Sequence, residues 1–279
     1  MKILRKLNYS RKLYKNRLYK FLHKDMISFI IVNYNSTKEL QNCLHDLCQI
    51  DNASECEVII INNDTQKLSL PKYNFQNQIL CEINKNIGYG AANNIGLKQV
   101  NREFVCFLNP DTHSFCTNLT TIIKHLENKK AIIMPQIRTE SGNSEPWSVG
   151  SRTSLLQLLG NNIGLYKKPW LSKQKTSVDW VSGAALFTST KLMRELGGFD
   201  EDFFLYFEDM DLCKRASAIG TEMYYVPQFH VTHTGGASSK KSTKKQKKCY
   251  YKSQDLFFQK HLGTFQTFLL RTCRFLHIK

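Results

Sequence analysis

Short apolar runs that each end at an asparagine constrain the fold of this chain most. Residues 27–32, 57–61 and 104–108 are rich in Ile, Val and Phe, and an Asn follows each run directly. Apolar residues at helical spacing follow the first run, over 40–47. Repeated strand–loop–helix units predict an open α/β sheet, which binds ligands at the carboxyl ends of its strands. The polar clusters are therefore expected to share one edge of a sheet.

Further elements are expected from the same patterns. A weaker strand is predicted at 78–81, a loop leading into a small-residue helix at 88–100, a strand at 180–187, a helix at 190–196 that ends at two glycines, and a short strand at 223–226. Residues 136–178 show no clear period and contain two of the three tryptophans. We expect this stretch to be a loop-rich insertion that faces the substrate.

Length and composition fit one large α/β domain with tails. The chain has 279 residues, 42% hydrophobic and 22% charged, enough to bury a sizeable core. We expect a central domain over 26–239, a basic amphipathic segment over 1–25 and a basic, aromatic tail over 240–279. Nine scattered cysteines without a Cys-x-x-Cys pair favour reduced thiols, and no signal-peptide or membrane-spanning run is seen. A cytoplasmic location is expected.

Positive charge is concentrated near both ends of the chain. Lys and Arg outnumber Asp and Glu by 39 to 23, a net charge of +16, and the terminal bases alternate with Ile, Leu, Tyr and Phe. Such segments can lie on an anionic bilayer, which predicts a peripheral protein on the inner face of the plasma membrane. Solvated tails are the alternative. Nucleic-acid binding is another, but the central domain shows no base-reading module, so no nucleic-acid partner is expected.

Three carboxylates follow an aromatic run where a helix is expected to begin. Glu208, Asp209 and Asp211 come directly after 203–207, so a positive charge is expected near them. The helix dipole is expected to hold them ionised and to lower their pKa. Asp211 is spaced for a structural ion pair with Arg215. Asp209, beside the aromatic collar, is the candidate general base, with Glu208 next; capping of the helix is the alternative reading.

Asp111 and His233 are the candidate metal ligands. Asp111 follows the strand at 104–108 and Pro110, so its carboxylate can leave the sheet edge toward a metal that bridges nucleotide phosphates. One His with one Asp gives a mixed nitrogen and oxygen set that Mn tolerates well, and Mg is the other candidate. The alternatives are an ordinary Asn-Pro-Asp-Thr turn and a surface His. The glycines at 88–96 lack the Lys of a phosphate-binding P-loop.

In this order the motifs resemble the inverting glycosyltransferases of family 2, in particular the rhamnosyltransferase-like branch that builds bacterial surface polysaccharide and O-antigen or capsule. The matching segments are 32–36, 61–64, 86–94, 108–112, 180–184, 197–211 and 233–238. The resemblance implies the GT-A fold, an α/β architecture with a mixed, mostly parallel sheet between helices. It also implies a pyrimidine nucleotide bound over the carboxyl ends of the strands.

The resemblance implies roles for single residues. Tyr34 and Asn35 would line the base pocket, and Asn62 stands where the family commonly has an Asp that reads the pyrimidine N3–H. Other expected contacts with the nucleotide sugar are Asn63, Gly88, Asn93, Asn109 and Gly183. Asp111 and His233 would hold Mn or Mg, and Asp209 would take the acceptor proton. Asn62 and Asn109 depart from the family, because each is an amide where a carboxylate is usual.

The implied partners are a dTDP- or UDP-sugar donor and a glycan or polyprenyl-diphosphate-linked acceptor. dTDP-rhamnose is one candidate donor. A transferase of hexose or N-acetylhexosamine from UDP is the alternative within the same fold. Donor, acceptor and linkage are expected to depend on the loops at 136–178.

Overall fold

The computed structural model describes residues 27–116, 119–127, 129–145, 148–150, 172–234 and 244–277. The basic segment 1–25 and most of the tryptophan-containing insertion lie outside the described residues. The first half of the domain consists of β1 (Ile27–Asn33), α2 (Thr37–Leu47), a 3₁₀ turn (Ala53–Glu55), β2 (Glu57–Asn62), β3 (Asn77–Glu82), α3 (Tyr89–Gln99) and β4 (Phe104–Leu108). Every strand and helix predicted in this half is confirmed.

The second half adds shorter strands and more helices. Its elements are β5 (Thr112–Cys116), α4 (Leu119–Leu126), β6 (Ala131–Arg138), β7 (Val149–Gly150), β8 (Thr176–Val178), β9 (Trp180–Val181), β10 (Ala185–Ser189), α6 (Thr190–Glu195), α7 (Glu208–Ala218), β11 (Glu222–His233), α8 (Lys244–His261) and α9 (Thr264–His277). The strands β5 and β6 and the helix α4 were not predicted.

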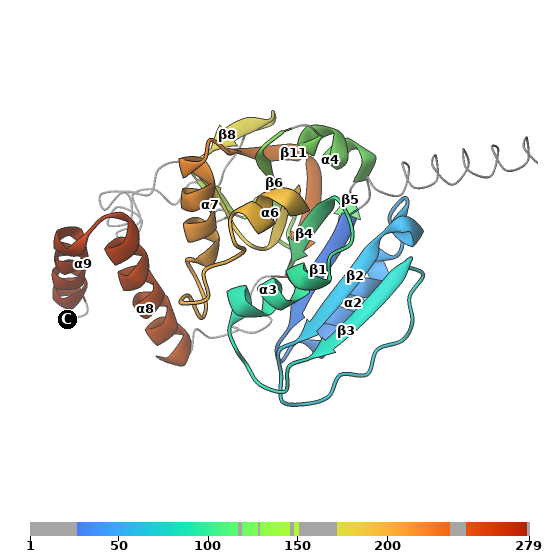
Figure 1. The fold of residues 1–279 in the computed structure, drawn as a ribbon, viewed down its shortest axis with the longest axis horizontal. Coiled ribbons are helices and arrows are strands. Elements are labelled where there is room, and N and C mark those ends of the chain that lie inside the picture. The colour runs from blue at the N-terminus through green and yellow to red at the C-terminus, as the bar shows by residue number, and fades with distance from the viewer. Residues whose placement is uncertain are drawn as a thin grey trace, which may run out of the picture.

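One mixed sheet organises the described residues. Its strand order is β3-β2-β1-β4-β10-β6-β11-β5, and β8 pairs with β11 beside this path. β1 to β4 run parallel to one another, β10 runs antiparallel to β4 and β6, and β11 runs parallel to β6. Only β10, β5 and β8 are reversed, so the predicted mixed, mostly parallel sheet is confirmed. Figure 1 shows α3 and α7 in front of the sheet and α2 on its far side.

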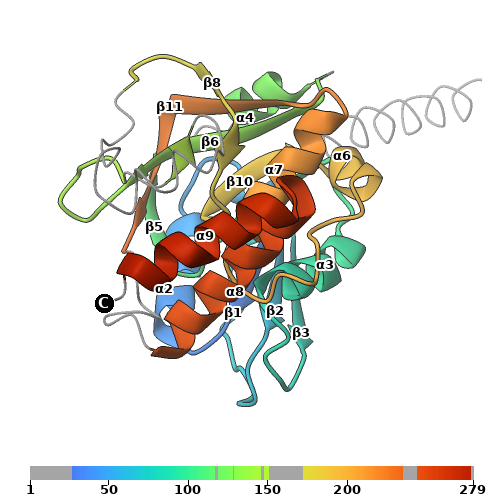
Figure 2. The ribbon, with the colours of Figure 1, turned by 90° about the vertical axis from the view of Figure 1, so that its left-hand side faces the viewer.

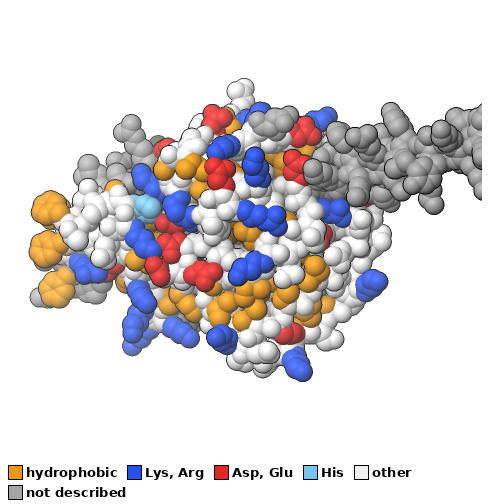
Figure 3. All heavy atoms as spheres, viewed as in Figure 1, with side chains coloured by type: hydrophobic (Ala, Val, Ile, Leu, Met, Phe, Trp, Pro, Cys, Tyr) orange, Lys and Arg blue, Asp and Glu red, His pale blue; other side chains and the backbone are white. Residues whose placement is uncertain are grey.

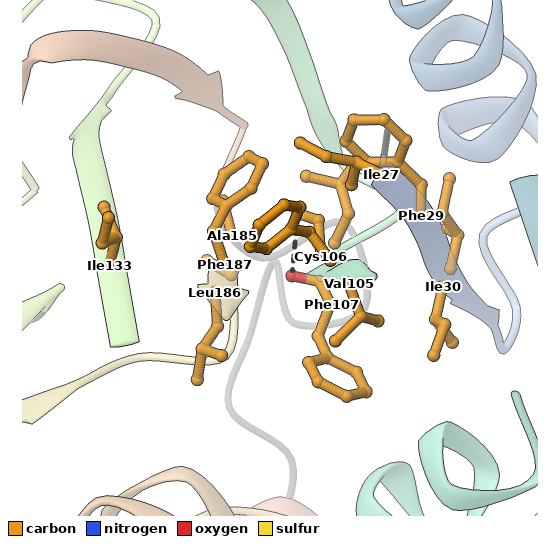
Figure 4. Packing of buried hydrophobic residues seen from close by; sticks show 14 of the residues in the cluster. Ile27, Phe29, Ile30, Val105, Cys106, Phe107, Ile133, Ala185, Leu186 and Phe187 are labelled. Atoms are coloured by element: carbon orange, nitrogen blue, oxygen red, sulfur yellow. Dashed lines mark hydrogen bonds between the residues drawn. The ribbon is translucent and has the colours of Figure 1, made fainter. Parts of the chain in front are cut away.

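Helices on both faces explain why the central strands are continuous apolar runs. Every residue of β1 and of β4 is buried. Figure 4 shows side chains of β1, β4, β10 and β6 meeting in this core. Phe29 of β1 and Phe187 of β10 make an edge-to-face contact with ring centroids 6.3 Å apart. Strands covered on both faces lose the alternation of apolar and polar residues that marks a half-exposed sheet.

Two predicted strands differ in extent from the structure. The run 180–187 is divided into β9 and β10 by a turn at 182–184, and this turn lies in the candidate site. The strand expected at 223–226 is the start of β11, which continues to His233 after an irregularity between Val226 and His230. Pro227 falls in that irregularity, and a proline cannot donate to a ladder of strand hydrogen bonds. The proline hid the continuation of the strand.

Two packed helices form the described part of the predicted tail 240–279. Figure 2 shows α8 and α9 side by side, with α9 outermost. Phe257 and Phe258 of α8 are fully buried against Phe203 and Phe207. These aromatic residues therefore belong to a second small core and are not surface anchors. None of the helices in the described ranges is both long and apolar enough to cross a membrane.

Candidate active site

A network of amides joins the ends of β1, β2 and β3. Asn33 donates a side-chain hydrogen bond to Asn62 Oδ1 over 2.9 Å, and Asn62 Nδ2 donates to the Glu82 carboxylate over 2.6 Å and to the Gln66 carbonyl over 2.7 Å. Asn33, Asn62 and Glu82 are neighbours in the sheet register. Asn62 is fully buried, and each of these hydrogen bonds joins it to another group of the protein. Contact between its oxygen and a nucleotide base therefore stays a prediction, and the contacts it makes here are structural.

Asn63 holds the loop that leads into α3. Its amide nitrogen donates to Asn86 Oδ1 and to the Gly88 carbonyl, each over 3.2 Å, and its oxygen accepts from the Ile87 N–H over 2.9 Å. Gly88 has φ of 96°, and a Cβ there would lie 2.6 Å from the carbonyl oxygen of Phe204. Only glycine fits both the positive φ and the close approach. The loop is thereby held against the segment that precedes α7.

Tyr34 and Asn35 lie at the surface beside this network. Tyr34 is exposed, and so is Asn35, whose φ of 51° is left-handed. The Asn35 N–H donates to the Asp64 carboxylate over 3.0 Å. Slight burial would raise the pKa of Asp64, but hydrogen bonds from the N–H groups of Asn35 and Thr65 lower it below its ordinary value. The two residues expected at the base pocket are therefore accessible, with an ionised Asp64 next to them that the sequence did not single out.

Tyr89 connects α3 to the turn between β9 and β10. Its hydroxyl donates to the Gly183 carbonyl over 2.9 Å, and Asn93, buried one turn further along α3, donates to the Tyr89 carbonyl over 3.1 Å. Asn109 N–H donates to the Ala184 carbonyl over 2.9 Å. The structure thus brings Asn93, Asn109 and Gly183 around one turn, and Tyr89 is an additional member that sequence reasoning missed.

Asp209 meets the same turn from α7. Its oxygens accept hydrogen bonds from the Gly183 N–H over 3.1 Å and the Met210 N–H over 2.8 Å. Burial raises the pKa of Asp209, and these backbone donors offset the rise only in part. Burial also raises the pKa of Glu208 well above its ordinary value, and the neighbouring Asp209 charge adds to the effect. The predicted lowering by the helix dipole is wrong, because desolvation of buried carboxylates outweighs it.

Of the three carboxylates at the start of α7, Asp211 has cationic partners among the described residues. Asp211 accepts from the Arg215 guanidinium and lies against His261 Nε2, each over 2.7 Å, so the predicted Asp211–Arg215 pair is confirmed. Glu208 is 6% exposed, and its Oε2 finds no hydrogen-bond partner in the part of the chain that the structure describes. Among the described side chains, the expected positive charge is found beside Asp211.

The residues before α7 are strained, and α8 holds them. Tyr206 and Phe207 have φ of 70° and 67°, a left-handed conformation that bulky residues rarely adopt. The Phe207 ring packs against Phe257, with centroids 5.6 Å apart, and Ser253 Oγ donates to the Leu205 carbonyl over 2.7 Å. The C-terminal hairpin thus fixes the backbone that leads into Glu208 and Asp209. This contact leaves no local pattern in the sequence, because it joins residues about 50 positions apart.

Asp111 and His233 meet at the start of β5 and the end of β11. Pairing of His233 with Thr112 brings His233 Nε2 to 3.0 Å from Asp111 Oδ1. On its other side, His233 Nδ1 lies 3.0 Å from Glu145 Oε2. Burial alone would lower the pKa of His233, but the two carboxylates raise it to about 10. Glu145 was missed, since it falls in the stretch where the sequence has no clear period.

This donor set suits a divalent metal that is shared with a substrate. Within the described ranges, no three His, Cys, Asp or Glu side chains are arranged to hold a metal ion by themselves. One imidazole beside one carboxylate is a mixed set that fits Mn, and Mg and Mn both accept oxygens from nucleotide phosphates. Asp111 and His233 fit such a shared ion, which would replace the proton on His233.

Hydrogen bonds through the turn at 182–184 connect the pair to Asp209. Glu145 contacts His233, and its carbonyl accepts from Ser148 Oγ over 3.1 Å. The Ser148 carbonyl accepts from the Ser182 N–H over 2.8 Å, and the next residue, Gly183, donates to Asp209. The base candidate therefore contacts this turn directly, and the metal-binding candidates are linked to it through Glu145 and Ser148.

Comparison with known proteins gives this arrangement a family. The model of glycosyl transferase family 2 matches residues 28–194. Rhamnosyltransferase WbbL of Escherichia coli (strain K12) is 29% identical over 75% of this chain and 83% of its own. An N-acetylglucosaminyl-diphospho-decaprenol L-rhamnosyltransferase of Mycobacterium tuberculosis (strain CDC 1551 / Oshkosh) is 24% identical over 90% of both chains.

Solved structures share the fold at low identity. GalNAc-T7 with UDP, GalNAc and Mn²⁺ superposes with a TM-score of 0.58 at 14% identity, over 84% of this chain and 49% of that one. Staphylococcus aureus TarS gives 0.54 at 16% identity, over 83% of this chain and 38% of that one. The chain thus spans half or less of these longer proteins. Since the family match covers more than half of its length, the chain belongs to glycosyl transferase family 2, with the GT-A fold and a resemblance to rhamnosyltransferases.

Proposed function

We propose that this glycosyltransferase moves a sugar, with rhamnose the leading candidate, from a pyrimidine nucleotide-diphospho-sugar to a glycan or polyprenyl-diphosphate-linked acceptor. The observation that carries the proposal is the turn at 182–184, which donates a hydrogen bond to Asp209 and is linked through Ser148 and Glu145 to His233, which lies 3.0 Å from Asp111. The names of the two rhamnosyltransferases support the sugar, and the decaprenol-linked substrate in one name supports the acceptor class. The proposed role of this chain is in cell-envelope polysaccharide synthesis.

Asp209 acts as the general base of an inverting displacement. An acceptor hydroxyl attacks the anomeric carbon, its proton passes to Asp209, and the bond from that carbon to the diphosphate breaks with both electrons leaving on the diphosphate. Burial raises the pKa of Asp209, which strengthens it as a base. The Gly183 N–H fixes one carboxylate oxygen, so the group is oriented before the acceptor arrives.

Asp111 and His233 would hold a divalent metal, which supplies positive charge for the departing diphosphate. Tyr34 and Asn35, accessible at the ends of the strands, are the proposed contacts to the base. Asn63 and Gly88 shape the loop beside them, and Asn62 acts behind them by holding three strands together. The basic ends of the chain are proposed to keep the protein on the inner face of the plasma membrane, near a lipid-linked acceptor.

Calorimetric titration of the full chain with a panel of dTDP- and UDP-sugars tests this function. Each titration is made with Mn or Mg present and repeated after chelation. Metal-dependent binding of one donor supports the proposal and identifies the sugar; selective binding of a UDP-hexose would favour the hexose alternative. The matched variants are Asp111→Asn, which should lose the metal-dependent part of binding, and Asp209→Asn, which should keep it. Absence of binding by every nucleotide in folded protein would refute the proposal.

A further inference from the structure

Three phenylalanines on the outermost helix project into solvent. Phe265, Phe268 and Phe275 of α9 are 71%, 66% and 70% exposed, whereas no other large hydrophobic side chain in the described ranges exceeds 40%. They lie three and seven positions apart, so they share one face of the helix. Scattered single hydrophobic residues are normal on a surface, but an aromatic stripe on one helix marks a contact site.

The other face of α9 is already used in packing. Leu270 is buried in the small core formed with Phe257 and Phe258, and Thr267 is buried with its hydroxyl donating to the Gly263 carbonyl over 2.9 Å. Arg274 and Arg271 reach back to Asp255 of α8, over 2.7 and 2.8 Å. The helix is therefore held firmly, and its aromatic face is not available to fold back onto the protein.

The charge around this face indicates an anionic partner. Residues 244–277 hold eight Lys and Arg and one acidic residue, Asp255. Figure 3 shows hydrophobic side chains at the end of the molecule where α9 lies, with Lys and Arg side chains close beside them. Arg271 follows Phe268 by three positions and precedes Phe275 by four, and its side chain is 58% exposed. Aromatic side chains flanked by bases are typical of helices that lie in the interface of an anionic bilayer.

We propose that α9 is the membrane-contacting surface of this protein. Its three phenylalanines enter the boundary between headgroups and acyl chains, and the bases around them meet anionic phosphates. The adjoining α8 contacts the segment before Asp209 through Ser253 and Asp211 through His261, so the hairpin that meets the bilayer also holds the segment of the proposed catalytic base. The reason given for membrane contact, access to a lipid-linked acceptor, rests on the proposed function. The contact itself does not, because binding to a bilayer is measurable without any nucleotide sugar.

A tryptophan placed on this face reports directly on insertion. Phe268→Trp in the full chain is mixed with vesicles of phosphatidylcholine and phosphatidylglycerol whose acyl chains are brominated. We expect a blue-shifted emission and quenching beyond that of the wild-type protein, whose own tryptophans provide the baseline. Leu80→Trp, at a comparably apolar exposed position on the edge strand β3, is the matched control and should show no added quenching. Bilayer binding through another surface alone, such as the basic segment 1–25 without α9, would leave Phe268→Trp unquenched and would overturn the proposal.

A variant that lacks the aromatic face distinguishes binding to a bilayer from binding to a second copy of the chain. The triple variant Phe265→Ser, Phe268→Ser, Phe275→Ser should bind these vesicles roughly tenfold or more weakly, with Leu80→Ser unchanged. Both variants should bind nucleotide sugar as the wild type does, which keeps this test independent of the proposed function. Sedimentation velocity without lipid should give the same mass for wild type and triple variant. A wild-type dimer that the triple variant abolishes, together with unchanged vesicle binding, would assign the face to self-association and refute the proposal.

Discussion

The amide network and the acidic segment lie on two sides of the same loop, yet they satisfy their polar atoms in different ways. In the network, Asn33, Asn62 and Asn63 are buried, and their amides bond to groups on neighbouring strands and loops. In the acidic segment, Glu208 keeps a buried oxygen without a partner among the described residues, and two left-handed residues precede it. The first region is stable by itself, whereas the second depends on α8.

This difference separates positioning from chemistry. A satisfied network holds strand ends at fixed places, which suits a nucleotide site that must be formed before the donor binds. A buried carboxylate with a raised pKa is poised to accept a proton, but it destabilises the fold when ionised. The hairpin contacts to Leu205, Phe207 and Asp211 offset that cost. Changes in the two regions should therefore have different signatures, one in stability and one in turnover.

The largest effect is expected at Asp209. Asp209→Asn preserves size and can keep the hydrogen bond from the Gly183 N–H on its single amide oxygen, but it loses the acceptor for the Met210 N–H and removes the proposed proton acceptor. Turnover should fall by roughly two or more orders of magnitude, while nucleotide-sugar affinity and melting temperature change little. Steady-state transfer rates beside calorimetric binding check this. Near wild-type turnover would move the base elsewhere, with Glu208 as the next candidate.

Asn63→Ala should produce the opposite signature. The change leaves the Ile87 N–H without its partner and removes one of the two hydrogen bonds to the Gly88 carbonyl, which also accepts from the Ala92 N–H; the loss costs about 2 kcal/mol of the free energy of unfolding. Urea denaturation measures the loss. Asn77→Ala is the matched control, because Asn77 is exposed and makes one side-chain hydrogen bond to Glu57. Equal destabilisation by both variants would mean that the network does not carry the stability assigned to it.

His261 tests whether the hairpin positions the acidic segment. His261→Ala removes one of two partners of the buried Asp211 and should lower turnover roughly tenfold, with donor affinity unchanged, because α7 is no longer fixed at that point. Lys130→Ala breaks an exposed ion pair with Glu195 and is the matched control, expected to have no measurable effect. His261→Gln, which can still donate to Asp211, should restore most of the rate. Equal loss in His261→Gln and His261→Ala would contradict a positioning role.

Much of the fold was predictable because buried strands and small-residue helices leave local patterns. β1, β2 and β4 were predicted from apolar runs, and the end of α6 from Gly197 and Gly198. Only the start of the long strand β11, at 223–226, was predicted, since Pro227 interrupts its pattern and its pairing with β5 and β6 is set by residues far away in the chain. Pairings between distant segments leave no periodic signal in either one.

The residues of the candidate site could likewise be predicted only in part. Asp111, His233 and Asp209 were predicted because carboxylates and a His beside strand or helix ends are recognisable in the sequence. Glu145 and His261 were not, because each contacts the site across more than 30 positions and lies among residues without a distinctive pattern. The sign of the Glu208 and Asp209 pKa shifts was also mispredicted. Helix position is visible in a sequence, whereas the burial that dominates these shifts comes from segments distant in the chain, such as the β9–β10 turn against Asp209.

The smallest effect, a change in stability with pH, is expected from Glu208→Gln. Burial raises the folded-state pKa of Glu208 above its ordinary value of 4.5, so between these two values the folded protein binds more protons than the unfolded chain. Stability is then lost as pH rises through this window, and below it the group makes no difference. Gln does not titrate, so Glu208→Gln and wild type should have nearly the same melting temperature at pH 4.5. At pH 8 the variant should melt at a higher temperature, and its free energy of unfolding should be larger by roughly 1 kcal/mol.

Scanning calorimetry across this pH range measures the difference between the two proteins, so that titration of all other groups cancels. A falling difference for Glu208→Gln would mean that ionised Glu208 stabilises the fold through a bound cation or the helix dipole. That result would remove the contrast between the two regions, because the acidic segment would then be as well satisfied as the amide network.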